Sequence, residues 1–470
     1  MPFDPTHHPL KFALPLLLLA TACQQAPPPN LSAQADVAPQ KKAEIHATAD
    51  LLLRPSQGFQ QASAQSALLT DLVAVQKAAA EQNLALLAAR LKAEAAHSAI
   101  DAAGGYPDPT FKIGGFVQPL ETRNGPTQAK LSLQQPLPWR QGLDAQVDVA
   151  RAGARQAEAG LAALQRKVRR QCAELWWELA YLHQADQIIQ QNLELLDSTH
   201  AVVSSRLEVG RARLPELLRV EMEAVQLRDR RRQFQDRQTP LRTRLNSLLG
   251  FSSSDAKWQK PTLPAGDWLQ NLALLDASKQ SFDASQHPEL AALAAAAQGQ
   301  LASWRMKQSA ERPQLGIGLD WTLVGDGNAM SPDSGEDAIA LMLSVKVPLH
   351  RGRDQARTAQ AHAHWQMAEQ AQRDREVQLL SEWQQARFEL DNALATAQLL
   401  EQELSTRVES ALQTELAAFE SGDEAFEGLL ASLRLLLDFQ LRHIEAQKQV
   451  MQSLAKLDEL AGVQLLEEVE

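Results

Sequence analysis

Apolar residues recur at every seventh position along two long segments of the chain, one in each half. In the first half this spacing predicts a helix over residues 143–206, about 96 Å long at about 1.5 Å per residue. An unbroken seven-residue repeat favours left-handed supercoiling against neighbouring helices. The repeat positions are Leu161, Val168, Leu175, Leu182, Ile189, Leu196 and Val203, and then Trp383, Leu390, Ala397, Leu404, Ala411 and Ala418.

Shorter segments between the helical patterns alternate apolar with polar or small residues. They predict four strands of roughly ten to twelve residues, paired around loops rich in Gly, Pro, Asn and Asp. A soluble hairpin would alternate too, but about ten alternating residues also match a tilted membrane strand. The apolar positions are Phe111, Ile113 and Val117; Leu131, Leu133 and Leu137; Leu315, Ile317, Leu319, Trp321 and Leu323; and Ile339, Leu341, Leu343, Val345 and Val347.

The two halves of the chain are copies of one plan. LSLQQPLPWRQG at 131–142 corresponds to LMLSVKVPLHRG at 341–352, and LRTRLNSLLG at 241–250 corresponds to SLAKLDELAG at 453–462. The offset between the copies changes little, which indicates a duplicated unit of about 190 residues. Each unit is helix–strand–strand–helix–turn–helix, with Gly210 and Gly422 at the turns. Further helices are expected over residues 66–103, 214–249, 284–310 and 428–461.

The amino-terminal residues predict export. FALPLLLLATA at 12–22 is too short to span a bilayer and is typical of a signal peptide, here residues 1–22. Thr21-Ala22 before Cys23 resembles a bacterial lipoprotein signal, which implies that Cys23 carries the lipid anchor. An ordinary cleaved signal with an incidental cysteine is the alternative. The Pro- and Gln-rich residues 23–61 are expected to be a tether.

Composition excludes several function classes. With 46 basic and 57 acidic residues the net charge is −11, which argues against a nucleic-acid-binding protein. Two cysteines exclude a disulfide framework and a four-cysteine zinc site. Without an apolar run near ~20 residues, the chain can cross a membrane only with strands. No spacing indicates catalysis, so we expect no enzyme, no catalytic residue and no cofactor.

Histidines and arginines offer two further motifs. His362 and His364 lie about 200° apart on a helix and cannot share one ion, so no metal site is expected. Residues 228–232 (RDRRR) are expected to be a solvated helix face with ion pairs. Trp176, Trp177 and Trp383 are expected to be helix-packing anchors.

Four strands cannot close a barrel, and an open sheet edge cannot exist in lipid. The smallest closed membrane barrels have eight strands, so the chain must assemble with copies of itself or stay out of the membrane. Three copies would supply twelve strands.

The order of these motifs resembles the TolC-like outer-membrane factor family over residues 62–462. The segments that resemble it are YPDPTF, LSLQQPLPWRQG, RLEVGRARLPELLRVEMEA, LNSLLG, VKVPLHRGRDQA and FESGDEAFEGLL. The resemblance implies a mainly helical homotrimer with a coiled-coil periplasmic α-barrel and a twelve-stranded barrel in outer-membrane lipid. It also implies a passive exit duct that docks onto a periplasmic adaptor and an inner-membrane pump of the resistance-nodulation-division type. GPTQAKLSLQQPLPW and NLELLDSTH are most similar to the branch paired with heavy-metal pumps, which implies metal cations or small toxic compounds as substrates.

The resemblance also assigns roles to the two turns. It places them at the periplasmic tip, against the adaptor, where glycine permits the positive φ of a tight turn. Plain loops without a partner are the alternative. The tip residues are Glu208, Gly210, Arg211, Arg213, Ser421, Gly422 and Asp423.

A pore gate is expected nearby. Some family members close the pore with aspartates six and nine residues after the second turn glycine; here Gly428 and Ala431 stand there, so that gate is not carried over. Threefold repetition of nearby acids would form rings that attract cations. Solvated helix-end acids are the alternative. The candidates are Glu216, Asp423, Glu424 and Glu427.

The expected domains are the first repeat at 62–250, a linker at 251–283 and the second repeat at 284–470. Two rivals to the efflux duct remain. One is a periplasmic coiled-coil lipoprotein, scaffold or adaptor, with soluble hairpins. The other is a duct for type I protein secretion.

Overall fold

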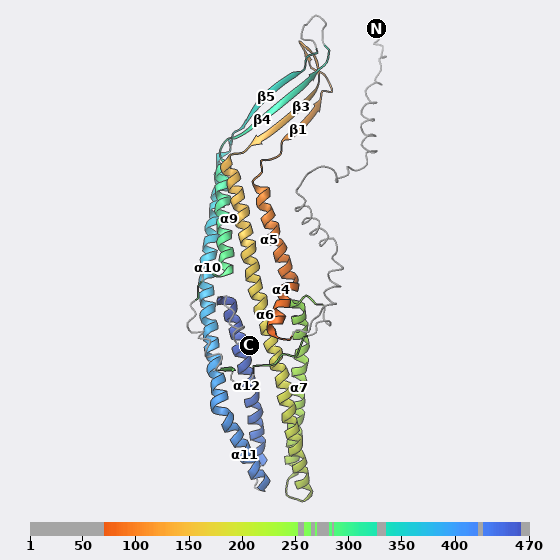
Figure 1. Ribbon diagram of the computed structural model, residues 1–470, viewed down its shortest axis with the longest axis vertical. Coiled ribbons are helices and arrows are strands. Elements are labelled where there is room, and N and C mark those ends of the chain that lie inside the picture. The colour runs from red at the N-terminus through yellow and green to blue at the C-terminus, as the bar shows by residue number, and fades with distance from the viewer. Residues whose placement is uncertain are drawn as a thin grey trace, which may run out of the picture. The chain divides into compact units, whose positions relative to one another are not determined.

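The computed structural model describes residues 70–251, 258–264, 268–269, 282–283, 286–326, 335–421 and 426–461. All of them belong to one compact unit, Ala67–Glu470. Long helices form most of it, and an antiparallel sheet lies at one end of the helices (Figure 1). This confirms the expected class, mainly helical with a strand part. Among the described residues, no helix is both long and apolar enough to cross a membrane.

The elements repeat in the expected order. The first copy comprises α4 (Leu72–Gln82), α5 (Leu84–Ala103), β1 (Thr110–Gly115), β2 (Glu121–Thr122), β3 (Gly125–Leu137), α6 (Arg140–Glu208) and α7 (Leu214–Leu248). The second comprises α9 (Pro288–Ala310), β4 (Gln314–Val324), β5 (Ala338–Lys346), α10 (Arg351–Gln398), the π-helix η3 (Leu399–Leu404), α11 (Ser405–Ser421) and α12 (Phe426–Ala461).

The expected single helix over 66–103 is wrong at Asn83. This residue is extended, with ψ 120°, and its Oδ1 accepts a hydrogen bond from the Leu86 amide at 3.1 Å. Its Nδ2 donates to the Leu248 carbonyl oxygen at 2.8 Å, at the end of α7. Asn83 therefore caps α5 and holds it against the end of α7.

Helix α6 is one continuous helix of 69 residues. The repeat residues from Val168 to Val203 are buried in the core, as the seven-residue spacing predicts, and Leu161 is partly buried against it. Trp176 and Trp177 are buried there too, which confirms their packing role.

The corresponding helix of the second copy is not continuous. The π-helix η3 separates α10 from α11, and a π-turn holds one residue more than an α-turn. Before η3, Leu390 and Ala397 are buried at the repeat positions, whereas beyond it the buried residues are Val408 and Phe419. Ala411 and Ala418 are only half-buried, because the extra residue rotates the apolar stripe.

The strands run in the order β1–β3–β4–β5, all antiparallel, and β2 pairs with β3. β4 has 11 residues, as expected, but β1 has only six and is shorter than predicted. The register aligns apolar residues across β1, β3, β4 and β5. One row is Phe111, Leu133, Leu319 and Leu341, and the next is Ile113, Leu131, Trp321 and Ile339.

The two faces of the sheet differ in polarity. The aligned apolar residues form one face, on which Ile113 is 72% and Leu341 84% exposed. The alternate residues of β1, β3 and β4 form a polar face, where Lys130 Nζ lies 2.7 Å from Asp320 Oδ2. The core of the unit therefore lies between the helices, and the apolar face of the sheet remains uncovered within one chain.

Two glycines with positive φ end α6 and α7, and they offer a matched stability test. Gly210 and Gly250 both have φ +74°, but a Cβ at Gly210 would meet open space, whereas one at Gly250 would lie 2.5 Å from the Gln82 carbonyl oxygen. We expect Gly210→Ala to lower the free energy of unfolding by about 1–2 kcal/mol through backbone strain alone. Gly250→Ala should lower it by about 1–3 kcal/mol more, because a backbone oxygen must also move.

Thermal unfolding of the detergent-solubilised protein checks both values. Gly160→Ala is the control, because Gly160 lies within α6 with open space around it, and alanine favours a helix there. Equal losses at positions 210 and 250 would contradict the packing of α7 against the α4–α5 junction.

Candidate functional site

The turn between α6 and α7 is closed by its own backbone. Gly210 has a positive φ; its amide donates to the Leu207 carbonyl at 3.0 Å, and the Arg211 amide donates to the Arg206 carbonyl at 2.8 Å. This is the Schellman arrangement, which satisfies carbonyls left over at a helix end. The turn is therefore a defined structure that presents exposed Glu208 and Arg211 at the tip.

Glu216, a candidate gate residue, faces its own helix end. Its carboxylate accepts from the Arg213 Nε at 2.9 Å and from the Arg213 backbone amide at 3.4 Å. Helix α7 begins at Leu214, so these bonds satisfy an amide at its start. The Glu216 side chain is mostly buried, whereas Arg213 is largely exposed.

The two helical arms of the chain meet at the tip. The Arg206 guanidinium lies 4.1 Å from the centre of the Phe419 ring and donates to the Phe419 carbonyl at 2.6 Å. Phe419 also packs against Phe426, with ring centres 6.5 Å apart, and both rings are buried. Arg219 of α7 forms an ion pair with Glu427 of α12. A cation–π contact, an aromatic pair and an ion pair thus join the first copy to the second.

A cleft of about 260 Å³ lies within this junction. It is lined by Arg206, Arg211, Arg213, Glu216, Glu427 and five other residues of the two arms. Among the described side chains of the lining, Glu216 pairs with Arg213, and Glu427 pairs with Arg219 beside the cleft.

The structure brings the residues of the first turn close to two of the gate candidates, Glu216 and Glu427. Ser421 is the last residue of α11. Gly422, Asp423 and Glu424 lie outside the described residues, as does Cys23. Gly428 lies in α12, and the Glu415 carboxylate occupies the space that a side chain at 428 would enter.

The inter-arm contacts were missed by sequence reasoning. Arg206 and Phe419 are 213 positions apart, and although each begins a segment that resembles the family, neither was assigned a role. Their equivalent places, just before the two turn glycines, could have indicated that they meet.

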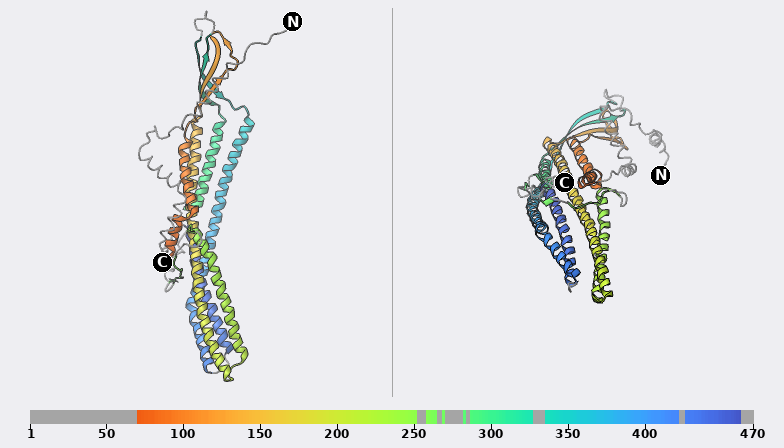
Figure 2. Two further views of the ribbon diagram at one scale, coloured as in Figure 1. Left: turned by 90° about the vertical axis from the view of Figure 1, so that its right-hand side faces the viewer. Right: turned by 60° about the horizontal axis from the view of Figure 1, so that its bottom comes forward.

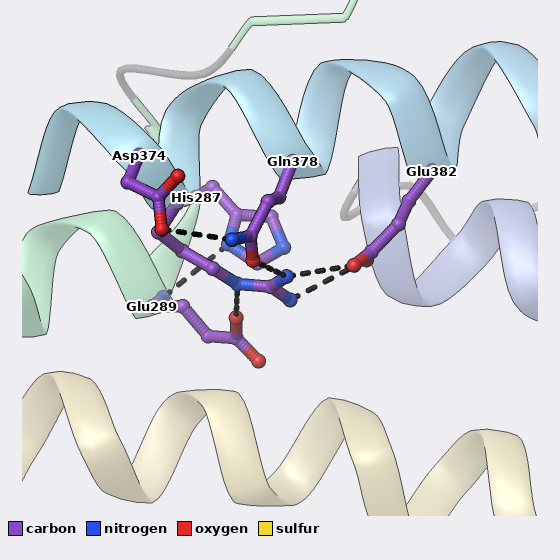
Figure 3. Close-up of polar contacts among 6 residues, drawn as sticks. His287, Glu289, Asp374, Gln378 and Glu382 are labelled. Carbon is purple, nitrogen blue, oxygen red and sulfur yellow. Dashed lines mark hydrogen bonds and ion pairs between the residues drawn. The ribbon is translucent and has the colours of Figure 1, made fainter. Parts of the chain in front are cut away.

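A second polar cluster joins α9 to α10 (Figure 3). The Arg375 guanidinium donates to Glu289 at 2.7 Å and to Glu382 at 2.7 Å. His287 caps α9, because its Nδ1 accepts from the Glu289 amide at 3.3 Å. His287 is 4% exposed, and this burial lowers the pKa of its ring.

The histidine pair His362 and His364 lies on α10, and the arginine-rich residues 228–232 lie on α7. No three His, Cys, Asp or Glu side chains in the described part of the chain could hold a metal ion. His362 packs edge-on against Trp304, with ring centres 4.9 Å apart. Arg231 pairs with Asp186 across α6 and α7, and Arg232 pairs with Asp229 on its own helix.

Helices that reach a common tip at one end, and a sheet with one apolar face at the other, are the arrangement expected of an outer-membrane duct. Residues 75–251 and 272–463 match the sequence model of the family described as outer membrane efflux protein. The chain belongs to the outer membrane efflux protein family. Its members are channels and not enzymes, with a long periplasmic helical part.

Solved structures share the fold. VceC from Vibrio cholerae is 18% identical, with 83% of this chain and 96% of VceC covered at a TM-score of 0.68. CusC is 16% identical, with 83% and 92% covered at a TM-score of 0.67. The open state of MtrE from Neisseria gonorrhoeae is 18% identical, with 83% and 88% covered at a TM-score of 0.62. No curated protein matches the chain.

The lowered pKa of His287 predicts that stability depends on pH. Burial lowers the pKa of His287 below its ordinary value of 6.5; Arg166 and Arg375 act in the same direction, while Glu289 and Glu382 oppose them. Above pH 6.5 the ring is neutral in both states, so its contribution is complete. Below that pH the unfolded chain takes up the proton first, and the free energy of unfolding falls.

We expect His287→Asn to reduce the loss of thermal stability between about pH 7.5 and 5.5, because asparagine keeps the cap without titrating. Unfolding temperatures at several pH values measure this. His97→Asn, at an exposed position on α5, is the control. An unchanged pH dependence in His287→Asn would show that the ring does not contribute.

Proposed function

We propose that the chain is the outer-membrane exit duct of a tripartite efflux system, working as a homotrimer. In this proposal, a periplasmic adaptor and an inner-membrane pump of the resistance-nodulation-division type deliver the substrate. The observation that carries the proposal is the register of the sheet. It places most of the large apolar side chains of four strands on one face, with Val324 and Met342 as exceptions, and leaves both outer strands open.

The open strands support the trimer. β1 and β5 each pair with one of the other long strands in the described sheet, so one edge of each faces outwards. In lipid every unpaired backbone group costs several kcal/mol, and neighbouring copies would remove that cost. Three chains with four long strands each form a closed barrel of twelve.

The outer helices support the same assembly. α5 packs on α6, α6 on α9 and α9 on α10, so α5 and α10 are the outer helices of this row (Figure 1). Both carry exposed apolar side chains that a neighbouring copy would cover. They are Leu84, Leu87 and Leu91 on α5, and Val377, Leu380 and Phe388 on α10.

The tip is the proposed adaptor surface. It lies at the opposite end of the helices from the sheet, so strands in the outer membrane would direct it into the periplasm (Figure 2). The proposed contacts are Glu208, Gly210, Arg211, Arg213, Ser421, Gly422 and Asp423.

The other parts of the proposal rest on sequence. A lipid on Cys23 would anchor the chain after removal of residues 1–22, and residues 23–61 would tether the repeats at 62–250 and 284–470. The resemblance of GPTQAKLSLQQPLPW to the heavy-metal branch favours metal cations or small toxic compounds as substrates. Type I protein secretion remains the rival within the class, and a periplasmic scaffold is the rival outside it.

The apolar face gives the sharpest test. Leu133 is exposed on that face and Gln134 points to the polar face of the same strand. We expect Leu133→Arg to block the outer-membrane trimer, because a charge facing lipid near mid-membrane costs about 2–4 kcal/mol. Gln134→Arg, with the same new charge one residue away, should assemble normally.

Native mass spectrometry of detergent-extracted outer membranes reads the result. The expected species is a trimer that requires detergent, with acyl mass on its amino terminus if Cys23 is lipidated. A water-soluble monomer or dimer, unaffected by Leu133→Arg, would favour the scaffold instead.

We further propose that Glu216, Asp423, Glu424 and Glu427 form an acidic constriction around the threefold axis. Glu427→Gln with Asp423→Asn should shift the pore's preference from cations towards anions, since Arg219 would lose its partner. Reversal potentials in planar bilayers under a salt gradient measure the change. Glu94→Gln, exposed on α5, is the control, and an unchanged preference in the double variant would refute the constriction.

A further inference from the structure

The charged side chains of β1, β3, β4 and β5 all lie on one face of the sheet. They are Lys112, Lys130, Asp320 and Lys346. In the register Lys112 lies opposite Ser132, and Ser132 lies opposite Asp320. Lys130 and Lys346 lie an even number of places from this row on β3 and β5. Because side chains alternate between the two faces of a sheet, all four share the polar face, with three cations to one anion.

This polar face is the inner side of the curved sheet. A Cβ at Gly316 would lie 2.5 Å from Ser344 Oγ, and one at Gly318 would lie 3.3 Å from Gln134 Cγ. Side chains of β3 and β5 therefore lean over β4 on this face, as they do on the concave side of a sheet. In the proposed closed trimer, the polar face lines the lumen and the apolar face meets lipid.

The lysines are more accessible from the inner side than the aspartate is. Lys130 Nζ lies 2.7 Å from Asp320 Oδ2, but the Lys130 side chain is 44% exposed and the Asp320 side chain only 4%. The pair thus presents its ammonium group and covers its carboxylate. Lys112 is exposed, and its Nζ donates to the neutral Gln134 Oε1 at 3.2 Å. A solute in the lumen would therefore meet positive charge on this wall.

Three copies in a ring would repeat these groups around one axis. Lys112 and Lys130 lie in neighbouring cross-strand rows, so six ammonium groups would surround the lumen at nearly one height, with three buried carboxylates behind them. Rings of lysine favour anions in pores, and lumen substitutions in membrane barrels alter selectivity. Such a field reaches about 10 Å at 0.1 M salt and about 3 Å at 1 M. Its effect on a passing ion is therefore largest at low salt.

We propose that Lys112 and Lys130 give the strand part of the duct a preference for anions. The inference rests on the proposed function, because a lumen requires the closed trimer. Of the substrates proposed above, small compounds with negative charge are favoured over free metal cations in this part of the duct. Asp320 limits the preference, since its carboxylate offsets one of the two ammonium groups of each chain.

The first test measures reversal potentials of the full-length trimer in planar bilayers, under a KCl gradient at about 0.1 M. We expect Lys112→Gln with Lys130→Gln to lower the chloride-to-potassium permeability ratio at least about threefold, and Asp320→Asn to raise it. Lys112→Gln alone keeps the ion pair of Lys130 intact and should give a smaller shift in the same direction. Lys77→Gln is the matched control, because this exposed lysine lies on α4, and the 20-residue helix α5 separates it from the sheet.

A second measurement reads the local potential without a current, so a closed tip does not affect it. Thr322→Cys introduces a thiol opposite Lys130 on the polar face. Its rates of reaction with a negatively and a positively charged thiosulfonate reagent are compared by peptide mass spectrometry, which reads position 322 separately from the buried Cys172. The ratio of the rates should favour the negative reagent, fall at least about threefold in the double-lysine variant, and approach that of a free thiol in 1 M salt.

Unchanged ratios in the double-lysine variant, or a shift towards cations in Asp320→Asn, overturn the proposal. Native mass spectrometry of the same preparations tests the assembly separately. A trimer that requires detergent but shows unchanged ratios refutes only the role of the lysines, whereas a water-soluble monomer refutes the proposed function.

Discussion

Backbone amides and carbonyls that lack partners in hydrocarbon are so costly that a sheet in a membrane must close on itself. The order β1–β3–β4–β5 satisfies this requirement inside the sheet but not at its two margins. Closure therefore becomes a property of several chains, and the row of helices below must be able to join into a ring as well. Exposed apolar side chains on the outermost helices are consistent with such a ring.

Long helices extend the structure far from the sheet. The repeat residues of α6 are buried along the helix, so α6 acts as a continuous support for α7, α9 and α12. Its end is joined to the second copy by Arg206 and Phe419, and α7 is joined to α12 by Arg219 and Glu427. The tip is thus a connected structure, in which side-chain contacts hold the two arms together.

Regular patterns could be predicted from the sequence, and single contacts could not. The seven-residue spacing predicted α6, the alternation predicted the apolar face of the sheet, and Gly210 marked a real turn. The break at Asn83 was missed because a hydrogen bond to Leu248, far along the chain, fixes it.

Contacts between the arms were missed for a related reason. The ion pair of Arg219 with Glu427 joins residues whose neighbourhood only the folded chain defines. The groove of about 820 Å³ between α9 and α10 was missed too, because its lining comes from α9, the segment before β4, the end of β5 and α10.

The π-helix at Leu399–Leu404 means that the two copies have ceased to be interchangeable. Each residue of an α-helix turns the chain by about 100°, so one surplus residue alters the direction of every side chain after it. Beyond the π-helix the buried residue that meets Arg206 is Phe419, one place after the repeat position Ala418. The two copies of the duplicated unit therefore differ in the direction of the side chains near the tip. A ring built from such chains alternates between two kinds of helical arm.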